Sequence, residues 1–66
     1  MYCNKLRYIR KEKGLTLEEL SEKSGLSSGY LCHLEKGSRN HPSIETMEKI
    51  ATALNKTVIE IFFNEQ

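Results

Sequence analysis

The sequence predicts a small all-α domain, and three features support that fold class. Apolar residues recur at the three- and four-residue spacing of amphipathic helices along most of the 66 residues. Hydroxyl-bearing residues and glycines stand where these periodic segments begin and end, as they do at helix caps. A single proline and four glycines leave no room for a linker. We therefore expect residues 1–66 to form one domain whose helices share a single core.

Composition limits the class of protein. A hydrophobic fraction of 38% and a charged fraction of 29% are ordinary for a soluble globular chain. The amino end carries basic residues but no continuous apolar run, which predicts neither a signal peptide nor a membrane anchor. Cys3 and Cys32 are too few and too far apart for a disulfide framework. This cysteine usage favours a reducing, cytoplasmic setting.

The first helix is expected over residues 4–13. Asn4 can cap it, Leu6 and Ile9 point inward, and Gly14 ends it. Its outward positions are basic, which suits either contact with phosphate groups or a solvated helix face. These positions are Lys5, Arg7, Lys11 and Lys13.

A second helix is expected over about residues 17–24. Thr16 is a good N-cap, and Glu19 completes a capping box three residues later. Gly25 supplies the left-handed backbone that ends a helix sharply.

A third helix follows directly, over about residues 28–36. Ser27 is its N-cap and Gly37 marks its end. The short connection before it is what two helices need to pack at roughly 90–120° to each other. Its inward positions are Tyr30, Leu31 and Leu34.

Two more helices are expected after Pro42. Ser43 caps the fourth, whose apolar stripe has the spacing of core residues rather than of a cofactor site. Thr57 caps a short fifth helix, with Glu60 as its capping-box partner. The stripe of the fourth helix is Ile44, Met47, Ile50, Ala51 and Leu54.

The fifth helix carries more large apolar residues than one side of a single turn can hold. Some of them must cover the core, and the surplus predicts a partner surface. We expect Ile59, Phe62 and Phe63 to form a two-fold interface between copies of the chain. The alternative is that all the apolar residues of this helix fold back onto the first and fourth helices.

The segment from Arg10 to Gly37, RKEKGLTLEELSEKSGLSSGYLCHLEKG, places a small residue, a glycine, an apolar residue and a serine cap at a restrictive spacing. Together with PSIETMEKIATAL after it, this segment resembles the Cro/C1-type helix-turn-helix regulators, the Xre-like repressors of phages, plasmids and bacteria. The resemblance covers nearly the whole chain. It implies a compact five-helix, lambda-repressor-like DNA-binding domain with the helix at 28–36 in the major groove.

The resemblance also implies roles for individual residues. In the family, an arginine near the end of the first helix pairs with a glutamate near the end of the recognition helix. Arg10 and Glu35 occupy the matching positions and are expected to form a structural ion pair. Many members hold a backbone phosphate with a glutamine just after the threonine cap. Leu17 stands there in this chain, which removes that donor.

The outward side chains of the helix at 28–36 are the candidate base readers. Ser28 can donate or accept a hydrogen bond, and His33 can donate to a purine. Within this helix, no arginine, asparagine or glutamine stands before Lys36. We therefore expect specificity to depend on DNA shape and on bridging water as well as on direct contacts. Gly29 would allow close approach of the backbone, and Cys32 would contact a thymine methyl. The Tyr30 hydroxyl would reach a phosphate. In the loop after the helix, Arg39 would contact a phosphate or the minor groove, and Asn40 a second phosphate. The predicted DNA-binding residues are Ser28, Gly29, Tyr30, Cys32, His33, Lys36, Arg39 and Asn40.

Charge is distributed unevenly along the chain. The net charge is only +1, but residues 1–41 hold eight basic and five acidic side chains, and residues 42–66 hold two basic and four acidic ones. A basic front half suits a domain with one face toward a polyanion. In so small a chain, the same asymmetry can also arise by chance.

Other kinds of site find little support. Cys3, Cys32, His33 and His41 lack the spacing of zinc ligands. The chain has no aspartate and no set of nucleophile, base and acid, so it is not expected to be an enzyme. We expect no metal, cofactor or small-molecule ligand. Cys32 remains open as a redox switch, because a lysine one turn away favours the thiolate.

Two functions remain open. The first is a cytoplasmic, homodimeric, sequence-specific DNA-binding transcriptional regulator, acting as a repressor on a palindromic operator. The second is a helix-turn-helix protein-interaction module, antitoxin-like or an adaptor, with little DNA specificity. The low net charge and the unusual outward residues of the helix at 28–36 favour the second function. The basic front half and the intact turn pattern favour the first.

Overall fold

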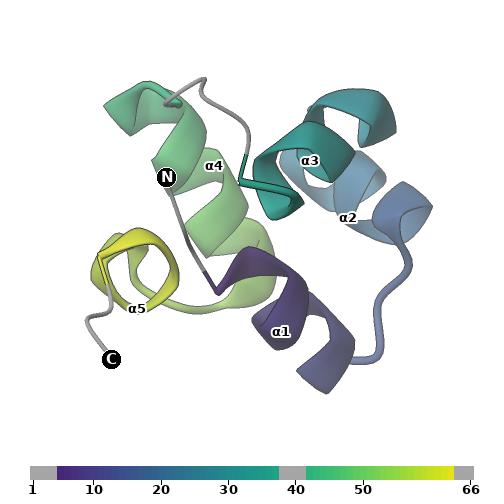
Figure 1. The fold of residues 1–66 in the computed structure, drawn as a ribbon, viewed down its shortest axis with the longest axis horizontal. Helices are drawn as coiled ribbons and strands as arrows, with labels where there is room; N and C mark the ends of the chain where they lie inside the picture. The colour runs from purple at the N-terminus through teal and green to yellow at the C-terminus, as the bar shows by residue number, and fades with distance from the viewer. Residues whose placement is uncertain (1–4, 38–41, 64–66) are drawn as a thin grey trace.

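The computed structural model describes residues 5–37 and 42–63, and within those ranges the chain is all-α (Figure 1). The fold class predicted from the sequence is therefore confirmed. The four later helices begin where their predicted caps place them. The elements are α1 (Leu6–Glu12), α2 (Leu17–Ser24), α3 (Ser28–Glu35), α4 (Ile44–Leu54) and α5 (Val58–Phe62).

Two capping boxes fix the starts of α2 and α5. At α2, the Glu19 backbone N–H donates to the Thr16 hydroxyl oxygen at 3.1 Å. The Glu19 carboxylate in turn accepts from the Thr16 backbone N–H at 2.9 Å. Thr57 and Glu60 repeat the arrangement at α5, with the same two distances. Both boxes were predicted, because each threonine stands three residues before its glutamate.

The start of α1 differs from the prediction. Lys5 occupies the N-cap position and makes no side-chain cap, while the predicted cap, Asn4, lies outside the described residues. The Lys5 backbone N–H instead donates to the Ile61 carbonyl at 2.9 Å, which joins the beginning of α1 to α5. At the other end, Gly14 has a φ of +73°, a left-handed conformation that glycine adopts without strain.

One hydrophobic core is shared by all five helices. Within it, α2 packs on both α3 and α4, and α1 packs on α3 and α5. Figure 1 shows α4 at the centre of the molecule, between α5 and the pair formed by α2 and α3. The buried apolar residues are Leu6, Ile9, Leu20, Leu31, Leu34, Met47, Ile50, Ala51, Leu54, Ile61 and Phe62.

Two predictions about apolar side chains are corrected by the structure. Ile44 was placed on the inward stripe of α4, but it is 62% exposed because it begins the helix, one turn before the buried Met47. Phe62 was placed at a dimer interface, but it is only 4% exposed and belongs to the core. In α5, Ile61 and Phe62 face inward together, so Phe62 has no free side chain to offer a partner.

None of the helices in the described part of the chain is long and apolar enough to cross a membrane.

Candidate nucleic-acid interface

The turn between α2 and α3 is closed by its own hydrogen bonds. Gly25 has a φ of +78°, and its backbone N–H donates to the Ser21 carbonyl at 2.8 Å. The Ser21 hydroxyl donates to the carbonyl of Leu26, and the Leu26 backbone N–H donates to the Ser24 hydroxyl oxygen at 3.3 Å. Both backbone polar groups of Leu26 therefore have partners while its side chain packs against the core. These bonds fix the direction in which α3 leaves the turn.

One side of α3 is anchored in the core. The Ser27 hydroxyl oxygen caps the helix by accepting from the Tyr30 backbone N–H at 3.1 Å. Leu31 and Leu34 are fully buried, and Tyr30 packs partly against the core. Because these residues turn inward, the opposite side of α3 is directed to solvent.

Five of the predicted DNA-binding residues share that opposite side. Gly29, His33 and Lys36 are exposed, while Ser28 and Cys32 are half-buried. Their spacing of three, four and seven residues places them within one stripe of the helix. We call this stripe the outward face of α3, and it comprises Ser28, Gly29, Cys32, His33 and Lys36.

Arg10 and Glu35 tie α3 to α1. The Nε and Nη2 atoms of Arg10 donate to the two carboxylate oxygens of Glu35, the second at 3.2 Å. The remaining nitrogen, Nη1, donates to the Leu15 carbonyl at 2.7 Å. The two side chains are only 9% and 6% exposed. The structure thus brings together the pair that the family resemblance implied, with the planar, two-point geometry that arginine forms with a carboxylate.

A hollow of about 400 Å³ opens where α1, α2 and α3 meet. Arg7 from α1 and Lys36 at the end of α3 both line it and are exposed. Leu17, where many family members carry a glutamine, lies in its wall. The lining residues are Arg7, Arg10, Leu17, Cys32, Glu35 and Lys36. Two exposed cationic side chains, Arg7 on α1 and Lys36 on the outward face of α3, therefore line this hollow.

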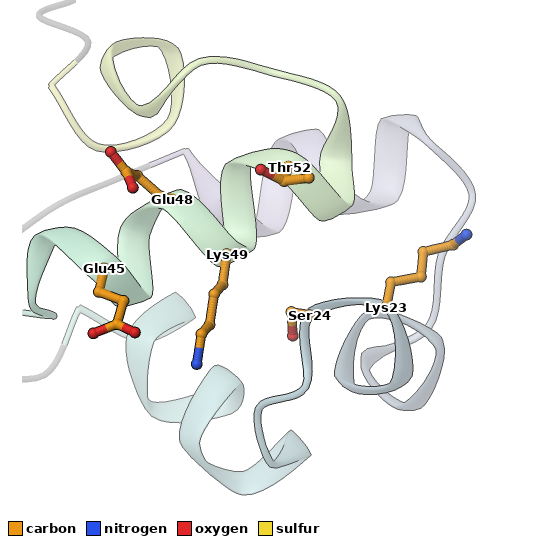
Figure 2. A pocket seen from close by; sticks show the side chains of 6 residues that line it. All are labelled: Lys23, Ser24, Glu45, Glu48, Lys49 and Thr52. Carbon is orange, nitrogen blue, oxygen red and sulfur yellow. The ribbon is translucent and has the colours of Figure 1, made fainter.

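Two other hollows lie away from that face. One, of about 610 Å³, is lined on α1 by Arg7, Tyr8, Lys11 and Glu12. The other, of about 320 Å³, lies between α2 and α4 (Figure 2). In Figure 2 the charged ends of Lys23 and Glu48 point away from Ser24 and in different directions. The residues lining this second hollow are Lys23, Ser24, Glu45, Glu48, Lys49 and Thr52, none of them a predicted base reader.

An exposed apolar pair remains on α5 and at its end. Ile59 is 67% exposed and Phe63 is 54% exposed. Phe63 follows the last residue of α5, and its backbone N–H donates to the Ile59 carbonyl at 3.1 Å, so the two residues are neighbours one turn apart, while Val58, Ile61 and Phe62 turn toward the core. Of the three residues predicted for a two-fold interface, the structure thus leaves Ile59 and Phe63 available.

Some predicted site residues cannot be placed. Arg39 and Asn40 lie outside the described residues, as do Cys3 and His41. Within the described ranges, no group of three or more His, Cys, Asp or Glu side chains is placed to hold a metal ion.

The third hydrogen bond of Arg10, to the Leu15 carbonyl, was not predicted from the sequence. The Leu15 carbonyl is a backbone group, and nothing in the side-chain pattern marks it as an acceptor. The exposed Tyr8 was also missed, although its position between the inward Leu6 and Ile9 could have indicated it. Its ring lies 5.8 Å from the Lys5 ammonium group, within the range of a cation–π contact.

Comparison with known proteins places this geometry in a family. The sequence pattern of the helix-turn-helix family matches residues 6–61, which cover α1 to α4 and all of α5 except its last residue, Phe62. The chain belongs to the Cro/C1-type helix-turn-helix family. This is a family of transcriptional regulators rather than of enzymes, in agreement with the expectation from the sequence.

Two similar proteins illustrate the relationship. The transcriptional regulator SinR of Bacillus subtilis is 38% identical over 58 residues, which are 88% of this chain and 52% of SinR. This chain therefore spans about half the length of that relative. The crystal structure of the restriction-modification controller protein C.AhdI of Aeromonas hydrophila has a TM-score of 0.79 and 41% identity, covering 85% of this chain and 83% of the other.

A second similar structure is that of SinR in complex with DNA. It has a TM-score of 0.77 and 39% identity, and covers 82% of this chain and 86% of that one. The helices of the helix-turn-helix domain are thus arranged in this chain as they are in a relative whose structure was determined in complex with DNA.

Proposed function

We propose that this chain is a sequence-specific DNA-binding transcriptional regulator that acts in the cytoplasm. It binds a palindromic operator as a homodimer and represses transcription. In the bound state, the outward faces of two α3 helices enter successive major grooves, about 34 Å apart. SinR, a relative of similar fold, has been solved in complex with DNA, which supports this proposal.

The observation that carries the proposal is the way α3 is held. The bidentate contact between Arg10 and Glu35, together with the buried Leu31 and Leu34, fixes the helix without using any residue of its outward face. A rigid helix whose exposed residues have no packing role suits the reading of base edges, where the position of each side chain matters.

Phosphate contacts would come from the hollow beside α3. Arg7 and Lys36 line it from two different helices, and both are exposed cations. Such contacts position a protein on DNA and do not depend on sequence. Leu17 has no hydrogen-bonding group to offer a phosphate. Among the described residues that line this hollow, Arg7 and Lys36 are therefore the exposed cations that can contact the DNA backbone. Arg39 and Asn40 are proposed as further contacts from the loop.

Dimer formation would use the exposed apolar pair of α5. Ile59 and Phe63 are neighbours one turn apart and are more than half exposed. Burying them against the same pair of a second copy would remove apolar surface from water and form a self-complementary contact.

A second candidate function is a protein-interaction module. Within the outward face of α3, Lys36 is the only side chain with a permanent charge, and no residue there makes the strong two-point contacts to bases that arginine, asparagine and glutamine make. A partner protein would then cover the face that we assign to DNA.

Selection from a random DNA pool tests the proposal. The full chain is mixed with random duplexes at moderate salt, and the bound duplexes are sequenced. We expect an inverted repeat whose half-site centres lie about one helical turn apart. Binding to that duplex should weaken steeply as salt rises, because phosphate contacts release counterions. A folded protein that enriches no motif would favour the protein-interaction module instead.

A further inference from the structure

Gly29 has no structural reason to be glycine. It lies in the first turn of α3, and it is not among the residues with a positive φ. A Cβ atom built on it would meet no neighbouring atom within 4 Å. Gly14 and Gly25 differ, because their φ values of +73° and +78° are strained for any other residue.

The absence of a side chain at this position carries a cost for the helix. Glycine loses more conformational freedom on folding than alanine does, so alanine would favour α3. The space above Gly29 is therefore a feature that the fold tolerates rather than requires. Because the residue is exposed on the outward face of α3, this space opens toward the proposed DNA.

Cys32 and His33 lie one turn after Gly29 on the same face of α3. They follow Gly29 by three and four residues, and helical side chains lean toward the N-terminus of their helix. The half-buried Cys32 behaves as a small apolar group with only a weak hydrogen-bonding capacity. The missing side chain of Gly29 leaves a gap in the outward face of α3, and Cys32 is the apolar residue one turn further along that face. We call this gap, together with Cys32, the notch.

We propose that this notch, formed by Gly29 and Cys32, takes the 5-methyl group of a thymine in each operator half-site. Of the four bases, only thymine presents a methyl group in the major groove. A gap that leaves the Cβ position of Gly29 free of contacts within 4 Å, one turn from an apolar side chain, matches that group better than it matches a hydrogen-bonding base edge. This inference rests on the proposed function, since it requires α3 to lie in the major groove.

The first test uses the wild-type chain and its selected operator. Each thymine of one half-site is replaced in turn by uracil, which removes the methyl group and leaves the hydrogen-bonding edge unchanged. At one position we expect the dissociation constant to rise about fourfold, the effect of losing one buried methyl group. Uniform tolerance of uracil at every thymine would overturn the proposal.

The second test uses Gly29→Ala, whose methyl group would fill the notch. The variant should melt at the same temperature as the wild type or higher, yet bind the thymine operator several times more weakly. For Gly29→Ala, replacing the thymine at the sensitive position by uracil should not weaken binding further. The effects of the two methyl groups on affinity would then not add, which shows that the two groups are coupled. A matched control is Thr52→Ala on the exposed side of α4, which also favours a helix but should leave DNA binding unchanged.

The outcomes separate this inference from the proposed function. If the wild-type chain enriches no DNA motif, the proposed function fails and this inference fails with it. If the wild type binds its operator and Gly29→Ala keeps both the affinity and the sensitivity to uracil, only the notch is wrong. A lower melting temperature for Gly29→Ala would also contradict the inference, because glycine would then serve the fold.

Discussion

Arg10 and Glu35, which are 25 residues apart in the sequence, form a bidentate ion pair that holds α3 against α1. The pair is nearly shielded from water, and its third hydrogen bond reaches the Leu15 carbonyl just before α2. One guanidinium group therefore connects the ends of three consecutive helical segments. The orientation of the outward face of α3 depends on this connection.

Breaking the pair should destabilise the whole domain. We expect Glu35→Ala to lower the free energy of unfolding by about 3–5 kcal/mol, because it leaves the Arg10 guanidinium buried without its counter-charge. That is a large share of the total stability of a domain of this size. Urea denaturation followed by circular dichroism measures the change.

The double variant Arg10→Met, Glu35→Leu is the matched control. Replacing both charges by apolar groups of similar volume is often close to neutral, so it should recover most of the lost stability. If Glu35→Ala unfolded at the same urea concentration as the wild type, the pair would have no structural role.

The dimer proposal predicts different outcomes for neighbouring residues of α5. Ile59→Glu and Phe63→Glu should give folded monomers, because charge is introduced only where the side chain is exposed. Sedimentation equilibrium reports the mass. Ile44→Glu is the control, since Ile44 is similarly exposed but stands on α4, and it should remain dimeric. A dimeric Phe63→Glu variant would exclude this face of α5 as the interface.

Phe62 should respond as a core residue. Phe62→Ala removes a large buried side chain, so we expect a loss of about 3–5 kcal/mol in the free energy of unfolding. Phe63→Ala, one residue later and more than half exposed, should change that free energy by about 0.5 kcal/mol or less. Comparable losses in the two variants, measured by urea denaturation, would contradict the assignment of Phe62 to the core.

The hollow between α1, α2 and α3 predicts a salt effect. Arg7→Ala and Lys36→Ala should each weaken binding to all DNA sequences about equally. Each should also reduce the slope of log affinity against log salt by about one per monomer. Lys49→Ala on α4, which lines the hollow between α2 and α4, is the control and should keep the wild-type slope. An unchanged slope in Arg7→Ala would remove that residue from the phosphate contacts.

Sequence patterns within each helix predicted most of the fold. The exceptions are residues whose burial depends on how the helices pack against one another. The caps at Thr16, Ser27, Ser43 and Thr57 could be recognised because each hydroxyl side chain bonds to the backbone of the next turn. The burial of Phe62 could not be recognised in the same way. In a helix of five residues, periodicity does not decide which of several large apolar side chains faces the core.

The candidate site was predictable to a similar extent. The outward face of α3 followed from the inward spacing of Leu31 and Leu34, and the ion pair from the family resemblance. The hollow lined by Arg7 and Lys36 did not follow, because it depends on how three helices meet. The open space above Gly29 is also a property of the packed structure, since a glycine in a helix has the same letter whether or not a side chain would fit there.

Glu60 gives the domain a pH dependence at low pH. Hydrogen bonds from the Thr57 backbone N–H and then from the Thr57 hydroxyl hold the pKa of the Glu60 carboxyl below its usual range. The folded state therefore binds the proton less readily than the unfolded chain does. The resulting stability is complete above the ordinary pKa of a glutamate and is lost as the pH falls through the lowered folded-state pKa. Glu60→Gln should be less stable than the wild type at neutral pH, and the difference in the free energy of unfolding should shrink as the pH is lowered below the ordinary pKa of a glutamate. Urea denaturation of both chains between neutral and acidic pH measures this difference. A difference that stayed constant with pH would show that the charge on Glu60 does not stabilise the start of α5.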